Sequence, residues 1–328
     1  NEVKNIVVTV VAATAVIQGH MTLGMMLAVQ YIIGQLNSPV EQLMNFFYSV
    51  QDVKISLERI NEIHQMDDEN GKDGLLTGLD HPEDGIHISN IMFKYDPHAL
   101  RKTIDGVDIL IPQGKVTAIV GASGSGKTTL IRLMLGYYPV LEGKITIGDT
   151  DINQLNRKWW RRQCGVVMQE GVIFSESIKR NIAVDDAEID EARLMRAAEI
   201  ACIKDYVMAL PLKFNTKIGR DGVGLSQGQK QRILIARAVY KNPDYIFLDE
   251  ATNSLDANNE RNIVENLDKF YQGKTVVIVA HRLSTVKNAD QIVVLDQGKV
   301  VEIGNHESLT AKRGAYYNLV KNQLELGN

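Results

Sequence analysis

The sequence predicts an α/β fold with a phosphate-binding loop, preceded by an all-α N-terminal part. Three observations carry this prediction. A β-branched run, Val116–Val120, leads directly into the glycine-rich stretch 121–128 and then into a helix-compatible segment. A second apolar run, Tyr245–Leu248, ends in two carboxylates. In contrast, residues 5–40 contain no Asp, Glu, Lys or Arg, so the chain begins with a segment of a different kind.

The composition is that of a globular protein. Of the 328 residues, 45% are hydrophobic and 23% are charged, and the net charge is −4. These values argue against disorder and against nucleic-acid binding by charge alone. The two cysteines, Cys164 and Cys202, fit neither a disulfide framework nor a metal site, and we expect them to be buried or half-buried thiols in a reducing compartment.

Residues 1–65 are predicted to be the end of one membrane helix followed by a complete one. The first apolar arm, Ile6–Ile17, is shorter than the ~20 residues that span a bilayer, and the chain lacks an initial Met, so we expect it to begin inside a helix. The second arm, Met21–Val40, is long enough to span, although it contains Gln30 and Asn37, which at membrane depth would face a bundle interior. The alternative is a soluble amphipathic hairpin.

An exposed acidic linker is predicted over residues 66–84, because this stretch is rich in Asp, Glu and Gly. From residue 85 to 328 the pattern is that of one α/β domain. Lys54 and Arg59, at the end of the helical part, favour the cytoplasmic side for this domain.

The phosphate-binding loop has the spacing GxxxxGK[ST] between a strand and a helix, which is the context such a loop requires. Lys127 is expected to reach the β- and γ-phosphates, and the Thr128 hydroxyl to ligate Mg²⁺. The expected nucleotide-binding residues of this loop are Gly121, Ala122, Ser123, Gly124, Ser125, Gly126, Lys127, Thr128 and Thr129.

Two further apolar runs end in polar residues, and the carboxyl ends of parallel strands are where ligands bind in such sheets. Asp249 is placed to hold Mg²⁺, and Glu250 to orient an attacking water and accept its proton. The third run, residues 275–280, ends at His281, for which a γ-phosphate contact is predicted.

Together these motifs resemble the nucleotide-binding domain of ATP-binding cassette (ABC) proteins over residues 85–324. Tyr95 resembles the aromatic residue that stacks on adenine, and Gln169 matches the glutamine of the Q-loop, a further Mg²⁺ contact. The family signature is matched by Leu225, Ser226, Gln227, Gly228 and Gln229, and its D-loop by Ser254, Leu255 and Asp256.

The resemblance implies a P-loop ABC ATPase core with an antiparallel β subdomain and a helical subdomain, using ATP and Mg²⁺. It also implies head-to-tail pairing, in which the signature caps the ATP of a second copy, so a homodimer is expected. Two residues depart from the family pattern: Gln227 replaces a Gly, and Arg220 replaces a Glu that is usual in exporters.

The N-terminal part resembles the last membrane helix of ABC exporters, and the domain resembles bacterial peptidase-containing peptide and bacteriocin exporters. The resemblance implies a multi-pass protein of the inner (plasma) membrane that exports a substrate, possibly a peptide, and binds no nucleic acid. Two other classes of protein fit the sequence less well. If the chain were a soluble ABC ATPase acting on nucleic acid or ribosomes, the uncharged segment 5–40 would be unexplained. If it were a P-loop kinase or GTPase, the signature would be unexplained.

Overall fold

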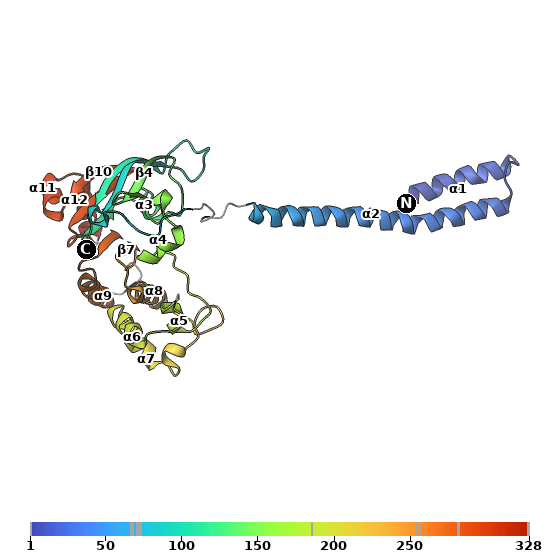
Figure 1. Cartoon of the computed structure of the whole chain (residues 1–328). Coiled ribbons are helices and arrows are strands. Elements are labelled where there is room, and N and C mark those ends of the chain that lie inside the picture. The colour runs from blue at the N-terminus through green and yellow to red at the C-terminus, as the bar shows by residue number, and fades with distance from the viewer. Residues whose placement is uncertain are drawn as a thin grey trace. The chain divides into compact units, whose positions relative to one another are not determined.

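The computed structural model describes residues 2–65, 69, 74–184, 186–252, 255, 257–280 and 283–326. The chain divides into two compact units, Asn1–Gly71 and Lys72–Asn328 (Figure 1). The first unit is helical and the second holds all the strands of the described residues.

The first unit is a pair of helices, α1 (Glu2–Ile17) and α2 (Leu23–His64), which lie side by side (Figure 1). The Thr22 hydroxyl caps the start of α2, and Gln30 Nε2 donates to Thr9 Oγ1 at 3.1 Å between the helices. Most of the large apolar side chains of this unit are exposed. Within the described residues no helix, α2 included, is both long enough and apolar enough to cross a membrane.

The second unit is built on a six-stranded sheet with the order β10-β9-β3-β8-β7-β6. The five strands β9, β3, β8, β7 and β6 are parallel to one another, and β10 pairs antiparallel with β9. The strands are β3 (Val116–Val120), β6 (Cys164–Val167), β7 (Tyr245–Asp249), β8 (Thr275–Val279), β9 (Gln291–Asp296) and β10 (Lys299–Gly304).

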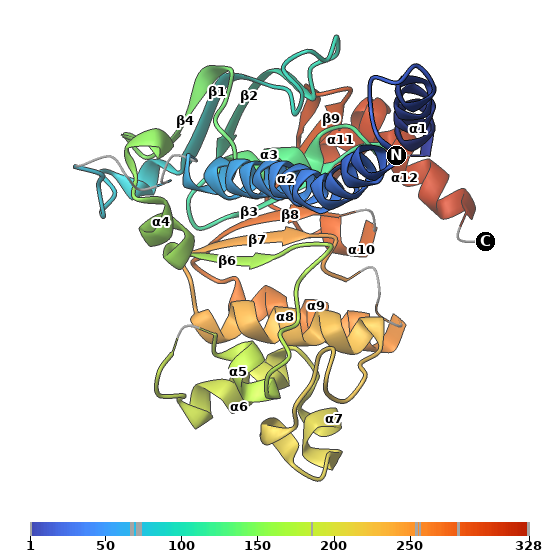
Figure 2. The ribbon, with the colours of Figure 1, turned by 90° about the vertical axis from the view of Figure 1, so that its right-hand side faces the viewer.

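These strands are apolar runs rather than alternating patterns because helices or a second sheet cover both faces of the sheet. In β7, Ile246 and Leu248 belong to one buried cluster, and Phe247 belongs to the other. The helices α8 (Gln227–Lys241) and α9 (Ala257–Phe270) pack on the first face (Figure 2).

A four-stranded antiparallel sheet and α3 (Lys127–Met134) cover the other face, which confirms the predicted antiparallel β subdomain (Figure 2). The order is β2-β1-β4-β5. These strands are β1 (Ile86–Phe93), β2 (Ile104–Ile111), β4 (Glu142–Ile147) and β5 (Thr150–Asp151).

The remaining helices include the predicted helical subdomain, formed by α5, α6 and α7 beside α8 (Figure 2). The α/β fold predicted for an ABC ATPase is therefore confirmed. These helices are α4 (Arg157–Gln163), α5 (Ile178–Ile182), α6 (Glu191–Ile200), α7 (Lys204–Ala209), α10 (Leu283–Val286), α11 (His306–Lys312) and α12 (Ala315–Leu326).

Trp160 on α4 provides a test of the packing between α4 and the sheet. Its side chain is fully buried, its ring meets Tyr245 edge-on at 4.9 Å, and its Nε1 donates to the Met134 carbonyl at 2.9 Å. Replacing Trp160 by Phe leaves a cavity and an unpaired carbonyl at the end of α3. We expect this change to lower the free energy of unfolding by about 2 kcal/mol in urea titrations. The half-buried neighbour Trp159, changed to Phe, should cost clearly less; equal losses would contradict this account.

Candidate functional site

The loop after β3 folds tightly because two of its glycines occupy backbone conformations that a side chain would obstruct. Gly126 has φ +102°, and a Cβ there would lie 2.8 Å from Ile104 Cδ1 and 2.9 Å from the Thr103 carbonyl oxygen. At Gly121 a Cβ would lie 2.1 Å from the Leu295 carbonyl oxygen. The loop therefore stands directly against β2 and β9 and delivers the chain into α3.

Lys127 is the first residue of α3, and it is almost completely buried. Its ammonium group donates to the carbonyls of Gly121 at 3.0 Å and Ala122 at 2.8 Å, so it is held inside the loop. Burial lowers the pKa of this amine, while the charges of Glu250 and Asp249 act to raise it. A bound phosphate would supply an anionic partner for this desolvated cation.

Asp249 ends β7 and is fully buried, yet neither of its carboxylate oxygens makes a hydrogen bond of ordinary geometry within the described residues. Burial is the main reason that the pKa of this carboxyl is raised, and the charge of Glu250 raises it further. The nearby Thr128 hydroxyl lowers the pKa without compensating for burial. Two orphaned carboxylate oxygens beside a hydroxyl suit Mg²⁺, which takes few protein oxygens and completes its shell with water and phosphate.

Glu250 follows Asp249 in the left-handed region, with φ +52°. Its backbone N–H donates to the Val279 carbonyl at 3.0 Å, so the strand-end turn is fixed by β8. This backbone conformation is uncommon for a residue other than Gly, and it is found at functional sites more often than elsewhere. No feature of the sequence signals it.

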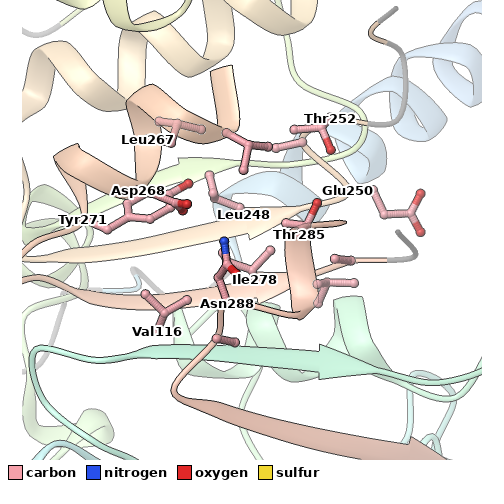
Figure 3. Close-up of a pocket in the computed structure, with 15 residues that line it drawn as sticks. Val116, Leu248, Glu250, Thr252, Leu267, Asp268, Tyr271, Ile278, Thr285 and Asn288 are labelled. Atoms are coloured by element: carbon pink, nitrogen blue, oxygen red, sulfur yellow. The ribbon is translucent and has the colours of Figure 1, made fainter. Parts of the chain in front are cut away.

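A small cavity lies behind these strand ends, between β7, β8 and α9 (Figure 3). Leu248, Ile278 and Tyr271 line it, and the Glu250 side chain projects away from these residues (Figure 3). Its volume of about 40 Å³ is far below the ~300 Å³ of a small-molecule pocket, so it cannot hold a nucleotide.

Gln169 lies two residues beyond the end of β6 and is exposed. In register, Val167 pairs with Leu248, and β7 pairs with β8 up to the Asp249–Val279 level. The sheet therefore brings Gln169, Asp249 and the loop after β3 to one edge.

Tyr95 lies beyond β1, and its side chain is 47% exposed. Its hydroxyl lies 3.2 Å from Thr129 Oγ1 and accepts a hydrogen bond from Arg132 Nη1 at 3.3 Å. Tyr138 meets its ring edge-on at a centroid distance of 5.3 Å. Arg132 and Tyr138 join this site only through the fold, and neither could be identified from the sequence because neither belongs to a motif.

The signature turn begins α8. Ser226 Oγ accepts from the Gln229 N–H at 3.2 Å, and the Gln229 side chain accepts from the Ser226 N–H at 2.8 Å, which makes a capping box. Ser226 and Gln227 are exposed, whereas Leu225, Gly228 and Gln229 are half-buried. Among the hydrogen bonds of the described residues, none joins this turn to the loop after β3.

Three predicted residues, Ser254, Asp256 and His281, lie outside the described residues. Leu255, between the first two, is buried in the cluster beneath the sheet. Ala280 directly follows β8, so the chain leaves the sheet at the same edge as the other predicted site residues.

Comparison with known proteins gives a consistent result. Residues 104–253 match the family described as "ABC transporter". Leukotoxin translocation ATP-binding proteins of Mannheimia haemolytica and Bibersteinia trehalosi are each 39% identical over 314 residues, which cover 96% of this chain and 44% of theirs. The chain thus spans less than half the length of these relatives. A solved bacterial Atm1-family ABC exporter with ATP bound superposes with a TM-score of 0.78 at 31% identity, over 93% of this chain and 53% of that one.

The orphaned carboxylate of Asp249 predicts a pH-dependent stability. Since its folded-state pKa is raised, the ionised carboxyl destabilises the fold progressively as the pH rises above the ordinary value near ~4. Without nucleotide, Asp249→Asn should therefore raise Tm at pH 7 by roughly 2–4 °C, which corresponds to about 1 kcal/mol for a domain of this size. The difference should vanish near pH 4. A variant that melts at or below wild type at pH 7, measured by scanning fluorimetry, would contradict this prediction.

Proposed function

We propose that this chain, which carries the nucleotide-binding domain of the ABC transporter family, is the ATP-hydrolysing part of a membrane exporter that works as a dimer. The observation that carries this proposal is the meeting of Lys127, Asp249 and Gln169 at one edge of the sheet. A cation, a buried carboxylate and an amide at one edge are suited to a phosphate chain and its metal ion.

ATP would be held by the loop after β3, with the Tyr95 ring on its base. The glycines bring backbone N–H groups close to the phosphates, and Lys127 would exchange its two carbonyl partners for phosphate oxygens. Thr128, Gln169 and Asp249 would hold Mg²⁺, which neutralises charge on the phosphates when it is bound.

Glu250 is assigned to orient a water for attack on the γ-phosphorus and to accept its proton, and His281 to contact the γ-phosphate. The left-handed backbone of Glu250 supports this role, because such conformations are concentrated at functional sites, and its side chain projects away from Leu248, Ile278 and Tyr271 (Figure 3). Removing the carboxylate charge should therefore stop the chemistry while leaving the nucleotide cradle unchanged.

The second copy of the chain is proposed as the partner. The exposed Ser226 and the half-buried Gly228 would cap the γ-phosphate held by the partner copy, while the D-loop would face the partner across the interface. Each chain has one phosphate-binding loop and one signature turn. When two copies pack about a two-fold axis, each loop can face the signature turn of the other copy.

The direction of transport and the site of action rest on the relatives. Proteins named for leukotoxin translocation and an ABC exporter support export, with a peptide or protein as the substrate class. We propose that residues 1–65 belong to the membrane domain, 66–84 to a linker and 85–328 to the cytoplasmic ATPase domain. The many exposed apolar side chains of α1 and α2 support a place among other helices of an inner-membrane bundle.

Glu250→Gln provides the direct test. In the full chain purified in detergent, we expect the rate of phosphate release to fall at least about 100-fold, because proton acceptance is lost. ATP should still be bound, and the variant should form a dimer that persists on size exclusion in ATP and Mg²⁺.

The matched control is Glu188→Gln, which removes an exposed carboxylate from the loop before α6 and should keep normal turnover. Normal turnover in Glu250→Gln would remove Glu250 from its assigned role. If neither protein pairs in ATP, the proposed dimer is wrong.

A further inference from the structure

The segment that follows Gln169 belongs structurally to the helical subdomain. Gly171 lies against α8, where a Cβ would meet Leu234 Cδ1 at 2.2 Å. Only Met168, Gln169 and Glu170 separate this segment from the last residue of β6. A displacement of Gln169 therefore reaches the α8 contact within two residues of chain.

Arg237 on α8 fastens the same segment. Its Nη1 donates to the Val172 carbonyl at 3.0 Å, and its Nε donates to the Asn181 carbonyl at 2.7 Å. Its guanidinium also lies 5.3 Å from the centre of the Phe174 ring. Its Nη2 also donates to Asn181 Oδ1 at 3.4 Å, and within the described residues Arg237 has no carboxylate partner.

Asn181 completes the attachment from α5. Its side chain is fully buried and donates to the carbonyls of Phe174, Glu176 and Ser177 at 3.0–3.3 Å. Its Oδ1 accepts from the Phe174 N–H at 2.8 Å. The backbone of the four residues 174–177 is thus held from inside by one amide.

The segment also pairs with the loop that leads to the signature turn. Ile178 N–H donates to the Thr216 carbonyl at 3.0 Å, and Ile218 N–H donates to the Glu176 carbonyl at 2.9 Å. At Gly219 a Cβ would meet the Phe174 carbonyl at 2.8 Å. Both the helix that begins at the signature and the loop before it are therefore attached to the residues after Gln169.

We infer that Arg237 and Asn181 are positioning residues that make the signature turn move with Gln169, so that nucleotide bound by one copy places Ser226 for the nucleotide of the other. This inference rests on the proposed function. The two ends of the attachment are distinct: Gln169 would contact the metal and γ-phosphate of its own cradle, and Ser226 would contact those of the partner. The residues after Gln169, held to α8 and to the loop before the signature turn, would therefore couple the two nucleotide sites of a dimer.

An arginine is required at this position for geometric reasons. Its planar fork reaches two carbonyls of separate segments and stacks on Phe174 at once, whereas the point charge of a lysine cannot do so. Burial lowers the pKa of the Arg237 guanidinium, which still remains protonated because arginine titrates so far above neutrality.

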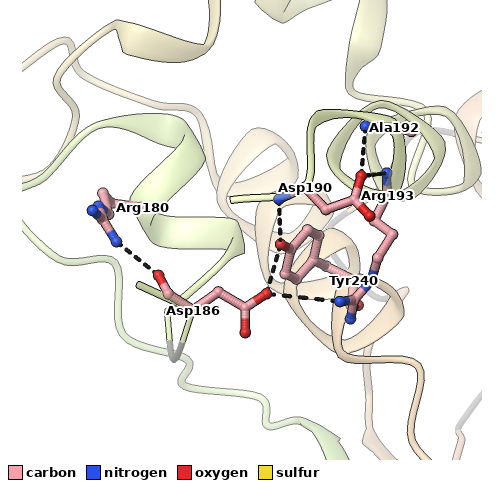
Figure 4. Close-up of polar contacts among 6 residues, drawn as sticks. All are labelled: Arg180, Asp186, Asp190, Ala192, Arg193 and Tyr240. Carbon is pink, nitrogen blue, oxygen red and sulfur yellow. Dashed lines mark hydrogen bonds and ion pairs between the residues drawn. The ribbon is translucent and has the colours of Figure 1, made fainter. Parts of the chain in front are cut away.

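Arg237→Lys is the test, and Arg193→Lys is its matched control. Arg193 also lies over an aromatic ring, 4.6 Å from the Tyr240 centroid, and donates to a carbonyl, that of Tyr240, at 2.7 Å. It ties α6 to α8 inside the helical subdomain, beside Asp186 and Asp190 (Figure 4). None of its hydrogen bonds, ion pairs or ring contacts within the described residues reaches the segment after Gln169. Both changes keep the positive charge and remove the planar guanidinium group. If the only effect were a loss of stability, the two variants should lose activity to a similar extent.

In the full chain, we expect Arg237→Lys to lower kcat for ATP about tenfold or more, with KM within about twofold of wild type. Combined with Glu250→Gln, it should also abolish the ATP-stabilised dimer. Arg193→Lys should keep kcat within about twofold and keep the dimer. A wild-type chain that neither hydrolyses ATP nor pairs would refute the proposed function and this inference with it. If wild type is active and the two lysine variants behave alike, the inference fails and the proposed function stands.

Gly171→Ala provides a second route if Arg237→Lys does not fold. The added methyl separates the segment from Leu234 and removes no side-chain hydrogen bond, so kcat should fall at least about threefold with KM unchanged. Gly78→Ala is its control, since a Cβ there meets nothing within 4 Å. Equal kcat values in these two variants would overturn the inference.

Discussion

The six-stranded sheet is buried on both faces, and this constraint determines where polar chemistry can occur in the second unit. Residues along β3, β7 and β8 face one apolar cluster or the other, so charged side chains are confined to the strand ends. At the carboxyl edge, burial lowers the pKa of Lys127 and raises that of Asp249. Each charge is thus unfavourable by itself, and the opposite charge nearby offsets part of the cost. A metal ion and a phosphate chain would satisfy both groups at once.

The parts of the site that are local in sequence could be predicted from it. The loop at 121–128 and the Asp249–Glu250 pair are recognisable because each directly follows an apolar strand, and strand ends of a parallel sheet meet. The contacts of Tyr95 with Arg132 and Tyr138 could not be predicted, because they join two segments that are distant in the chain. The left-handed backbone of Glu250 also has no sequence signal, since the β8 carbonyl that fixes it is distant in the chain.

The helical subdomain shows the same division. Its existence followed from the resemblance, and α6 and α8 have the apolar periodicity that predicts helices. In the sequence, however, Arg237 is an ordinary helix residue among apolar neighbours. Only the fold shows that it reaches Val172 and Asn181, because backbone carbonyls of an irregular segment carry no pattern that a sequence could reveal.

The structure also bears on the Gln that replaces Gly in the signature. Gln227 is exposed at the first position of α8, and the capping box joins residues on either side of it, Ser226 and Gln229. The first backbone bond of the helix runs from the Lys230 N–H to the Ser226 carbonyl at 3.0 Å. The N–H groups of Gln227 and Gly228 precede that bond, so they remain available at the helix end whatever side chain residue 227 carries. The substitution therefore leaves intact the features of the turn that an anion would recognise, and the Gln227 side chain is exposed.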